Sequence, residues 1–150
     1  MNIEVNADTA KVDKMLADFP AALARAQRQA LKDIGQDVVS RATQAFRTPQ
    51  LRPAPWAPRK PSKRDNGHPL LIKSGILRRS IEWKFNGVDT VIVGSDKKYA
   101  GYHQFGTRRM PARPFMPLDA NGNLTPQMAQ KVNRFIEKAL SDELAKIIKK

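Results

Sequence analysis

The sequence predicts a single α+β domain in which a long N-terminal helix and a C-terminal helix pack on a small antiparallel sheet. Three observations predict this class: apolar residues at helical spacing near both ends of the chain, alternating apolar and polar residues around Asn86-Gly87, and a length of 150 residues. That length suits one domain, residues 1–150, with a core of its own. The chain contains no cysteine, which excludes disulfides and thiolate chemistry and is compatible with a reducing cytoplasm.

The N-terminal helix is predicted from apolar residues that recur at steps of three and four between Val12 and Phe46. A short strand over residues 3–5 is expected to precede it. Because Pro20 lacks an amide hydrogen, we expect it in the first turn of a second, longer helix that runs from about Pro20 to Phe46. One face of this helix is expected to pack on the sheet.

Residues 47–72 are predicted to form a long, extended and mobile basic loop. Six prolines between Pro49 and Pro69 exclude a helix or a central strand here. Structureless loops of this length are usually functional or disordered. Trp56 has two interpretations that the sequence leaves open: it stacks on a nucleic-acid base or anchors the loop on a neighbour, or it packs on the core of its own chain.

A helical turn and a β-hairpin are predicted after the loop. Ser74 is the expected N-cap of the turn, and Leu77 its first inward residue. Residues 80–85 and 90–94 alternate between apolar and polar side chains, and Asn86-Gly87 between them suits a tight turn.

A third strand is expected over residues 99–105, ended by Gly106, so that the sheet is small and antiparallel. An extended, proline-stiffened segment follows over 108–117, and a turn over 119–123. Thr125 then caps the C-terminal helix, with a proline at its first position.

The net charge of +13 is concentrated in the middle of the chain. Residues 47–80 hold nine basic side chains against Asp65 alone, and three more arginines lie between 108 and 113. Such clustering indicates contact with DNA or with an acidic partner surface, and the alternative is solvated surface. The candidate contacts are Arg59, Lys60, Lys63, Arg64, Arg78, Arg79, Arg108, Arg109 and Arg113.

The sequence contains few of the side-chain patterns that an enzyme needs. Its two histidines, His68 in the loop and His103 on the expected third strand, belong to no HExxH pattern, and no Walker loop or GxSxG elbow is present. The aspartates near the strands stand at turn positions. We therefore expect no catalytic residue, no metal site and no cofactor. No segment approaches the roughly 20 apolar residues of a membrane span, so no membrane contact is expected.

Four motifs lie in a fixed order between Lys73 and Leu118: Ser74-Gly75-Ile76-Leu77-Arg78-Arg79-Ser80-Ile81, Tyr99-Ala100, His103-Gln104-Phe105-Gly106-Thr107 and Pro111-Ala112-Arg113-Pro114-Phe115. In this order and spacing they resemble the phage virion morphogenesis, or tail completion, proteins of tailed phages and prophages. The resemblance covers residues 74–118 in motif and nearly the whole chain in layout. The residues expected to give the site its shape are Ser74, Gly75, Leu77, Tyr99, His103, Gln104, Phe105, Gly106, Pro114 and Phe115.

The resemblance implies an α+β structural protein without catalytic activity, placed in the virion at the neck or tail after assembly in the host cytoplasm. There its copies would form a ring that completes the tail and joins it to the head. The implied partners are other tail or neck proteins and further copies of the chain, with non-specific contact to DNA in the neck. The alternative function is sequence-independent DNA binding through the basic loop, for which no reader module is visible.

Overall fold

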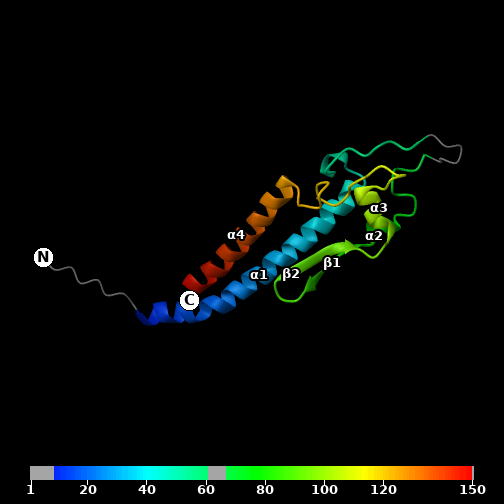
Figure 1. Ribbon diagram of the computed structural model, residues 1–150. Coiled ribbons are helices and arrows are strands. Elements are labelled where there is room, and N and C mark those ends of the chain that lie inside the picture. The colour runs from blue at the N-terminus through cyan, green and yellow to red at the C-terminus, as the bar shows by residue number, and fades with distance from the viewer. Residues whose placement is uncertain (1–8, 61–66, 150) are drawn as a thin grey trace.

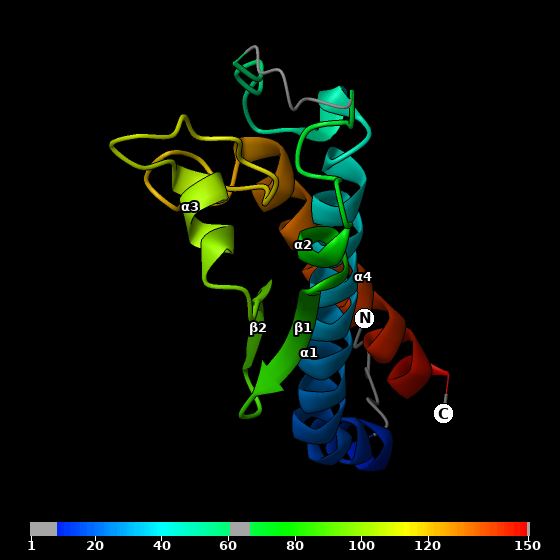
Figure 2. The ribbon, with the colours of Figure 1, turned by 90° about the vertical axis from the view of Figure 1, so that its right-hand side faces the viewer.

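The computed structural model of the protein describes residues 9–60 and 67–149 and has three layers: a β-hairpin, a long helix and a second helix (Figures 1 and 2). In chain order the elements are α1 (Thr9–Ala45), the 3-10 helix η1 (Pro49–Leu51), α2 (Ile76–Arg79), β1 (Ile81–Asn86), β2 (Thr90–Ser95), α3 (Tyr99–Phe105) and α4 (Pro126–Ile148). α1 lies in the middle, with the hairpin on one side and α4 on the other. The predicted α+β class is confirmed, and α4 packs mainly on α1.

α1 is one continuous helix that contains Pro20, so the predicted start of a second helix at this proline is wrong. A proline inside a helix removes one backbone hydrogen bond and bends the helix, and the first turns of α1 run at an angle to the rest (Figure 1). The carbonyl that loses its partner belongs to Leu16, which is 67% exposed. Water can therefore satisfy this carbonyl, and the helix continues. The strand predicted over residues 3–5 lies outside the described residues.

Small side chains let α4 lie close against α1. Ala22, Ala26 and Ala30 repeat every fourth residue of α1 and are at most 3% exposed. Ala26 and Ala30 form a buried cluster with Ala139 of α4. The two helices are antiparallel, with the C-terminal end of α4 beside the N-terminal half of α1 (Figure 1).

The predicted hairpin is confirmed, and it packs on α1 through an aromatic side chain. β1 and β2 pair antiparallel, with Asn86 opposite Thr90 at the turn. The ring of Trp83 lies over Gly35 of α1 so closely that a Cβ at this glycine would be 2.8 Å from the ring. The indole leaves no room for a Cβ at this position of α1. This close packing explains why a glycine occurs inside the helix.

The main core lies where the C-terminal end of α1 meets the loop, α2, the start of β1 and residues 107–118, which we call the motif segment. Its buried members are Ala42, Ala45, Phe46, Trp56, Leu77, Ile81 and Phe115. Trp56 is 9% exposed, and its ring meets that of Phe46 edge-on at 5.8 Å between centroids. Of the two interpretations of Trp56, packing on its own core is confirmed. Leu77 is 4% exposed, as predicted for the first inward residue of its turn.

Tyr99–Phe105 forms α3, so the predicted third strand is wrong and His103 lies on a helix. Its less exposed side chains, Ala100, His103 and Gln104, have the spacing i, i+3, i+4 of one helical face. A strand would instead bury every second residue. The sheet accordingly consists of β1 and β2 in the described part of the chain.

The start of α4 matches its prediction, whereas the start of α2 differs from its prediction by one residue. The N-cap of α2 is Gly75, with φ of 67°, and not the predicted Ser74. Ser74 contributes one residue earlier, because its hydroxyl oxygen accepts the Ile76 amide at 3.4 Å. α4 begins as predicted, with Thr125 at the N-cap and Pro126 at the first helical position.

Candidate assembly surface

Gln104 joins α3 to the segment that follows it. Its side chain is buried, and its Oε1 accepts the backbone amides of Phe115 at 3.0 Å and Met116 at 2.9 Å. Its Nε2 donates to the carbonyl of Met116 at 3.5 Å. One neutral amide thus satisfies three backbone groups that no strand partner reaches. This arrangement holds the extended segment against the helix.

Gly106 allows the chain to reverse directly after α3. Its φ is 76°, and a Cβ there would lie 2.8 Å from the amide nitrogen of Ala112. Beyond it, Thr107 and Met110 exchange two backbone hydrogen bonds, of 2.8 and 3.2 Å. Arg108 and Arg109 occupy the tip of this tight turn, where both are exposed.

Two side chains fasten the loop to the motif segment. The indole Nε1 of Trp56 donates to the carbonyl of Pro114 at 2.7 Å. From the other direction, Arg113 donates from Nε to the carbonyl of Ala57 at 3.0 Å and from Nη2 to that of Pro58 at 3.2 Å. Arg113, predicted as a partner contact, therefore uses its guanidinium within the chain. The mobility predicted for residues 47–72 stays a prediction.

His103 is a packed side chain of α3. Its ring meets Tyr99 edge-on at 6.1 Å between centroids, and its buried Nδ1 has no hydrogen-bond partner. Burial, and then the positive charge of Arg113, lower the pKa of His103 below its ordinary value. The neutral ring is favoured in the fold. Among the described residues, no group of three His, Asp or Glu side chains is placed to hold a metal ion.

The outer side of α3 presents aromatic side chains to solvent. Tyr99, Tyr102 and Phe105 are 40%, 56% and 55% exposed and lie three residues apart. Arg108 and Arg109 follow on the adjacent turn. We call these five residues the motif surface. The signal for it in the sequence is the helical spacing of three aromatics, which the expected strand obscured.

The remaining candidate contacts are distributed more widely. Arg59 donates to the carbonyl of His68 at 3.0 Å, and Lys60 is exposed. Lys63 and Arg64 lie outside the described residues. Arg78 and Arg79 line a pocket of about 460 Å³ at the C-terminal end of α1, together with Arg47, which the sequence did not single out as a contact.

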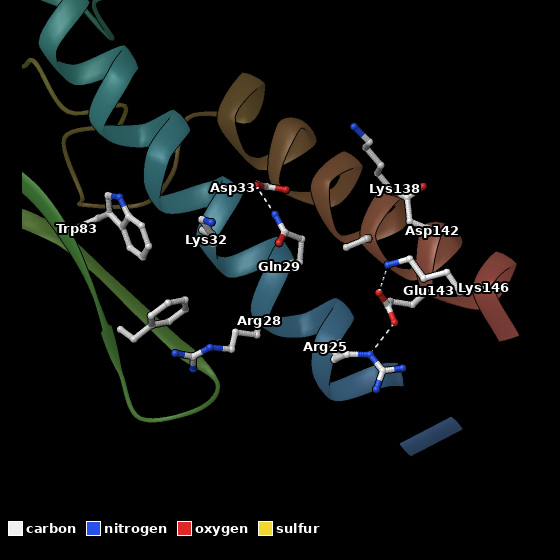
Figure 3. Close-up of a pocket in the computed structure, with 12 residues that line it drawn as sticks. Arg25, Arg28, Gln29, Lys32, Asp33, Trp83, Lys138, Asp142, Glu143 and Lys146 are labelled. Carbon is white, nitrogen blue, oxygen red and sulfur yellow. Dashed lines mark hydrogen bonds and ion pairs between the residues drawn. The ribbon is translucent and has the colours of Figure 1, made fainter. Parts of the chain in front are cut away.

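A larger hollow of about 780 Å³ lies across α1, between the hairpin and α4 (Figure 3). The carboxylate of Glu143 on α4 accepts two hydrogen bonds. Nε of Arg25 on α1 donates to its Oε2 at 2.9 Å, and Nζ of Lys146 donates to its Oε1 at 2.5 Å. Lys146, and then Arg25, lower the pKa of Glu143, so this carboxylate is ionised and paired. Trp83 lines the hairpin side, over Gly35. These groups fasten the three layers together.

Exposed aromatic and arginine side chains such as those of the motif surface are typical of proteins that act through contacts with other macromolecules. The model of the phage virion morphogenesis family matches residues 7–141, and the chain therefore belongs to this family. Comparison with curated proteins and with solved structures gave no match. Within the described residues, no helix has the length and apolar character needed to cross a membrane.

Proposed function

We propose that this virion morphogenesis protein completes the phage tail at its head-proximal end and enables head–tail joining as a non-enzymatic ring subunit. The observation that carries the proposal is the motif surface. Tyr102 and Phe105 are each more than half exposed on α3, and the exposed Arg108 and Arg109 follow them in the next turn of the chain. Tyrosine, phenylalanine and arginine are enriched at the centres of protein interfaces. When a partner covers clustered exposed aromatic side chains, their removal from water lowers the free energy of the assembly.

The support beneath this surface suits an assembly role. Gln104 fixes the segment after α3, and Trp56 and Arg113 tie that segment to the loop. A surface held in shape before binding loses less conformational entropy on association. The partners proposed for it are neighbouring copies in the ring and other tail or neck proteins. With these partners, the proposed site of action is the neck of the virion.

Complementation of a phage that lacks the gene tests this proposal. The double variant Tyr102→Ser/Phe105→Ser removes the two most exposed aromatic side chains of the motif surface and leaves the buried side of α3 unchanged. Val88→Ser is the matched control, because Val88 is 79% exposed in the hairpin turn, away from α3. We expect the double variant to leave heads and tails unjoined and the control to restore infectious particles. Full complementation by a folded double variant would contradict the proposal.

DNA binding through the basic loop is the second candidate function. Net charge of +13 and the exposed Lys60 favour it. Its test is titration of duplex DNA at several salt concentrations. A steep loss of affinity with salt, abolished when Arg59, Lys60, Lys63 and Arg64 are neutralised, would support it.

A further inference from the structure

The pocket at the C-terminal end of α1 gathers three arginines from two parts of the chain. Arg47 lies two residues after the end of α1, whereas Arg78 and Arg79 end α2. The hollow of about 460 Å³ is completed by Thr43, Gln44, Thr48 and Ile81. No acidic side chain lines it in the part of the chain that the structure describes. Three like charges therefore share one concave surface without an internal counter-charge.

The end of α1 does not need these guanidinium groups. Terminal helix carbonyls require hydrogen-bond donors, and arginines near a helix end often supply them. Here the carbonyl of Gln44 accepts the backbone amide of Arg47 at 2.9 Å. Arg52 donates from Nε to the carbonyl of Ala45 at 2.8 Å and from Nη2 to the carbonyl of Phe46 at 3.3 Å. The carbonyls of Gln44, Ala45 and Phe46 thus have donors other than the pocket arginines.

Most of the donors in the pocket remain available. Arg79 uses Nη2 on the carbonyl of Ser74 at 3.1 Å. The guanidinium groups of Arg47 and Arg78 form no hydrogen bond or ion pair with the described part of the chain. Each guanidinium presents five N–H donors in a planar fork that matches a carboxylate or a phosphate. An anion would also relieve the repulsion between the three positive charges.

We propose that this pocket binds carboxylate side chains of an acidic segment on a neighbouring protein of the assembled tail, an inference that rests on the proposed assembly function. The three arginines converge on one hollow, whereas duplex DNA is held by basic groups spread along its phosphates. Ile81 adds an apolar side chain to the lining, beside Thr43 and Thr48. That mixture suits the methylenes and carboxylate of an acidic side chain.

Binding of a fluorescent peptide of eight glutamates to the full chain tests the assignment. The variant Arg47→Lys/Arg78→Lys keeps the net charge but removes the planar forks. Arg28→Lys/Arg134→Lys is the control, since it makes the same chemical change at exposed positions outside both the pocket and the motif surface. We expect the pocket variant to bind the peptide about tenfold more weakly than the wild type, and the control to bind like the wild type.

Two results would overturn the assignment. Equal affinity of the pocket variant and the wild type would show that diffuse charge, and not the pocket, attracts the peptide. A loss of affinity for a 20-base-pair duplex, with peptide binding unchanged, would make the pocket a nucleic-acid contact. The assay uses the isolated protein, so its failure leaves the particle experiments to judge tail completion separately.

Discussion

The indole Nε1 of Trp56 donates a 2.7 Å hydrogen bond to the carbonyl of Pro114, joining residues 58 positions apart. The bond closes the proline-rich loop onto the segment that follows α3. Beneath it, Phe46 contacts both Trp56 and Phe115, at 5.8 and 5.2 Å between ring centroids. The loop, the end of α1 and the motif segment therefore share one core.

Trp56→Phe tests this connection. The substitution keeps an aromatic ring but leaves the carbonyl of Pro114 without its donor. We expect the free energy of unfolding to fall by about 1–3 kcal/mol, the usual cost of an unsatisfied buried polar group. Urea denaturation followed by circular dichroism measures it. An unchanged midpoint would show that the hydrogen bond is dispensable.

Substitutions at Gln104 separate its accepting and donating roles. Gln104→Leu leaves the amides of Phe115 and Met116 unpaired, and each buried unpaired amide costs about 1–3 kcal/mol. Gln104→Glu loses the long bond to the carbonyl of Met116 and buries a carboxylate, but it keeps an acceptor for both amides, whose hydrogen bonds offset part of that burial cost. We therefore expect the leucine variant to be the less stable of the two in urea. The reverse order would contradict the role assigned to Oε1.

Two glycines in helices should respond in opposite directions to alanine. At Gly35 the added Cβ would lie 2.8 Å from the Trp83 ring, so the hairpin must shift. Overpacking of this kind typically costs about 1–3 kcal/mol. At Gly101 in α3 a Cβ would meet nothing within 4 Å, and alanine should stabilise by about 0.4–1 kcal/mol. Thermal unfolding of both variants checks this contrast. Equal shifts of the unfolding temperature in the two variants would contradict it.

His103 should make stability depend on pH. Its pKa is lowered in the fold from the ordinary 6.5, so the unfolded chain binds a proton that the folded chain does not. The contribution of the neutral His103 ring to stability is fully present above pH 6.5. It is lost as the pH falls through the lowered pKa of the folded state. In His103→Gln the free energy of unfolding should change less with pH below 6.5. An identical slope in both proteins would assign the dependence to other groups.

The sequence was sufficient where local rules and burial agree. Asn86-Gly87 predicted the hairpin turn, and Thr125-Pro126 the start of α4. α3 was missed because seven residues are too few to separate a period of two from one of 3.6. Pro20 was misplaced because the rule against proline inside helices is relaxed where water reaches the freed carbonyl.

The site was harder to predict, because its parts meet only in the fold. The aromatic and arginine motifs were visible in the sequence. Gln104 is buried and bonded to two backbone amides only because residues 115 and 116 fold back onto α3. Similarly, Arg47 joins Arg78 and Arg79 only because α2 docks at the end of α1. No local pattern carries such long-range contacts.

Electron microscopy of particles from a phage with an early stop codon in this gene tests the central claim most directly. If the protein completes the tail and permits joining, filled heads should lie beside separate, unjoined or overlong tails. Supplying the intact gene in trans should restore joined virions. Normal, infectious virions from the stop-codon phage would contradict the proposed role in tail completion.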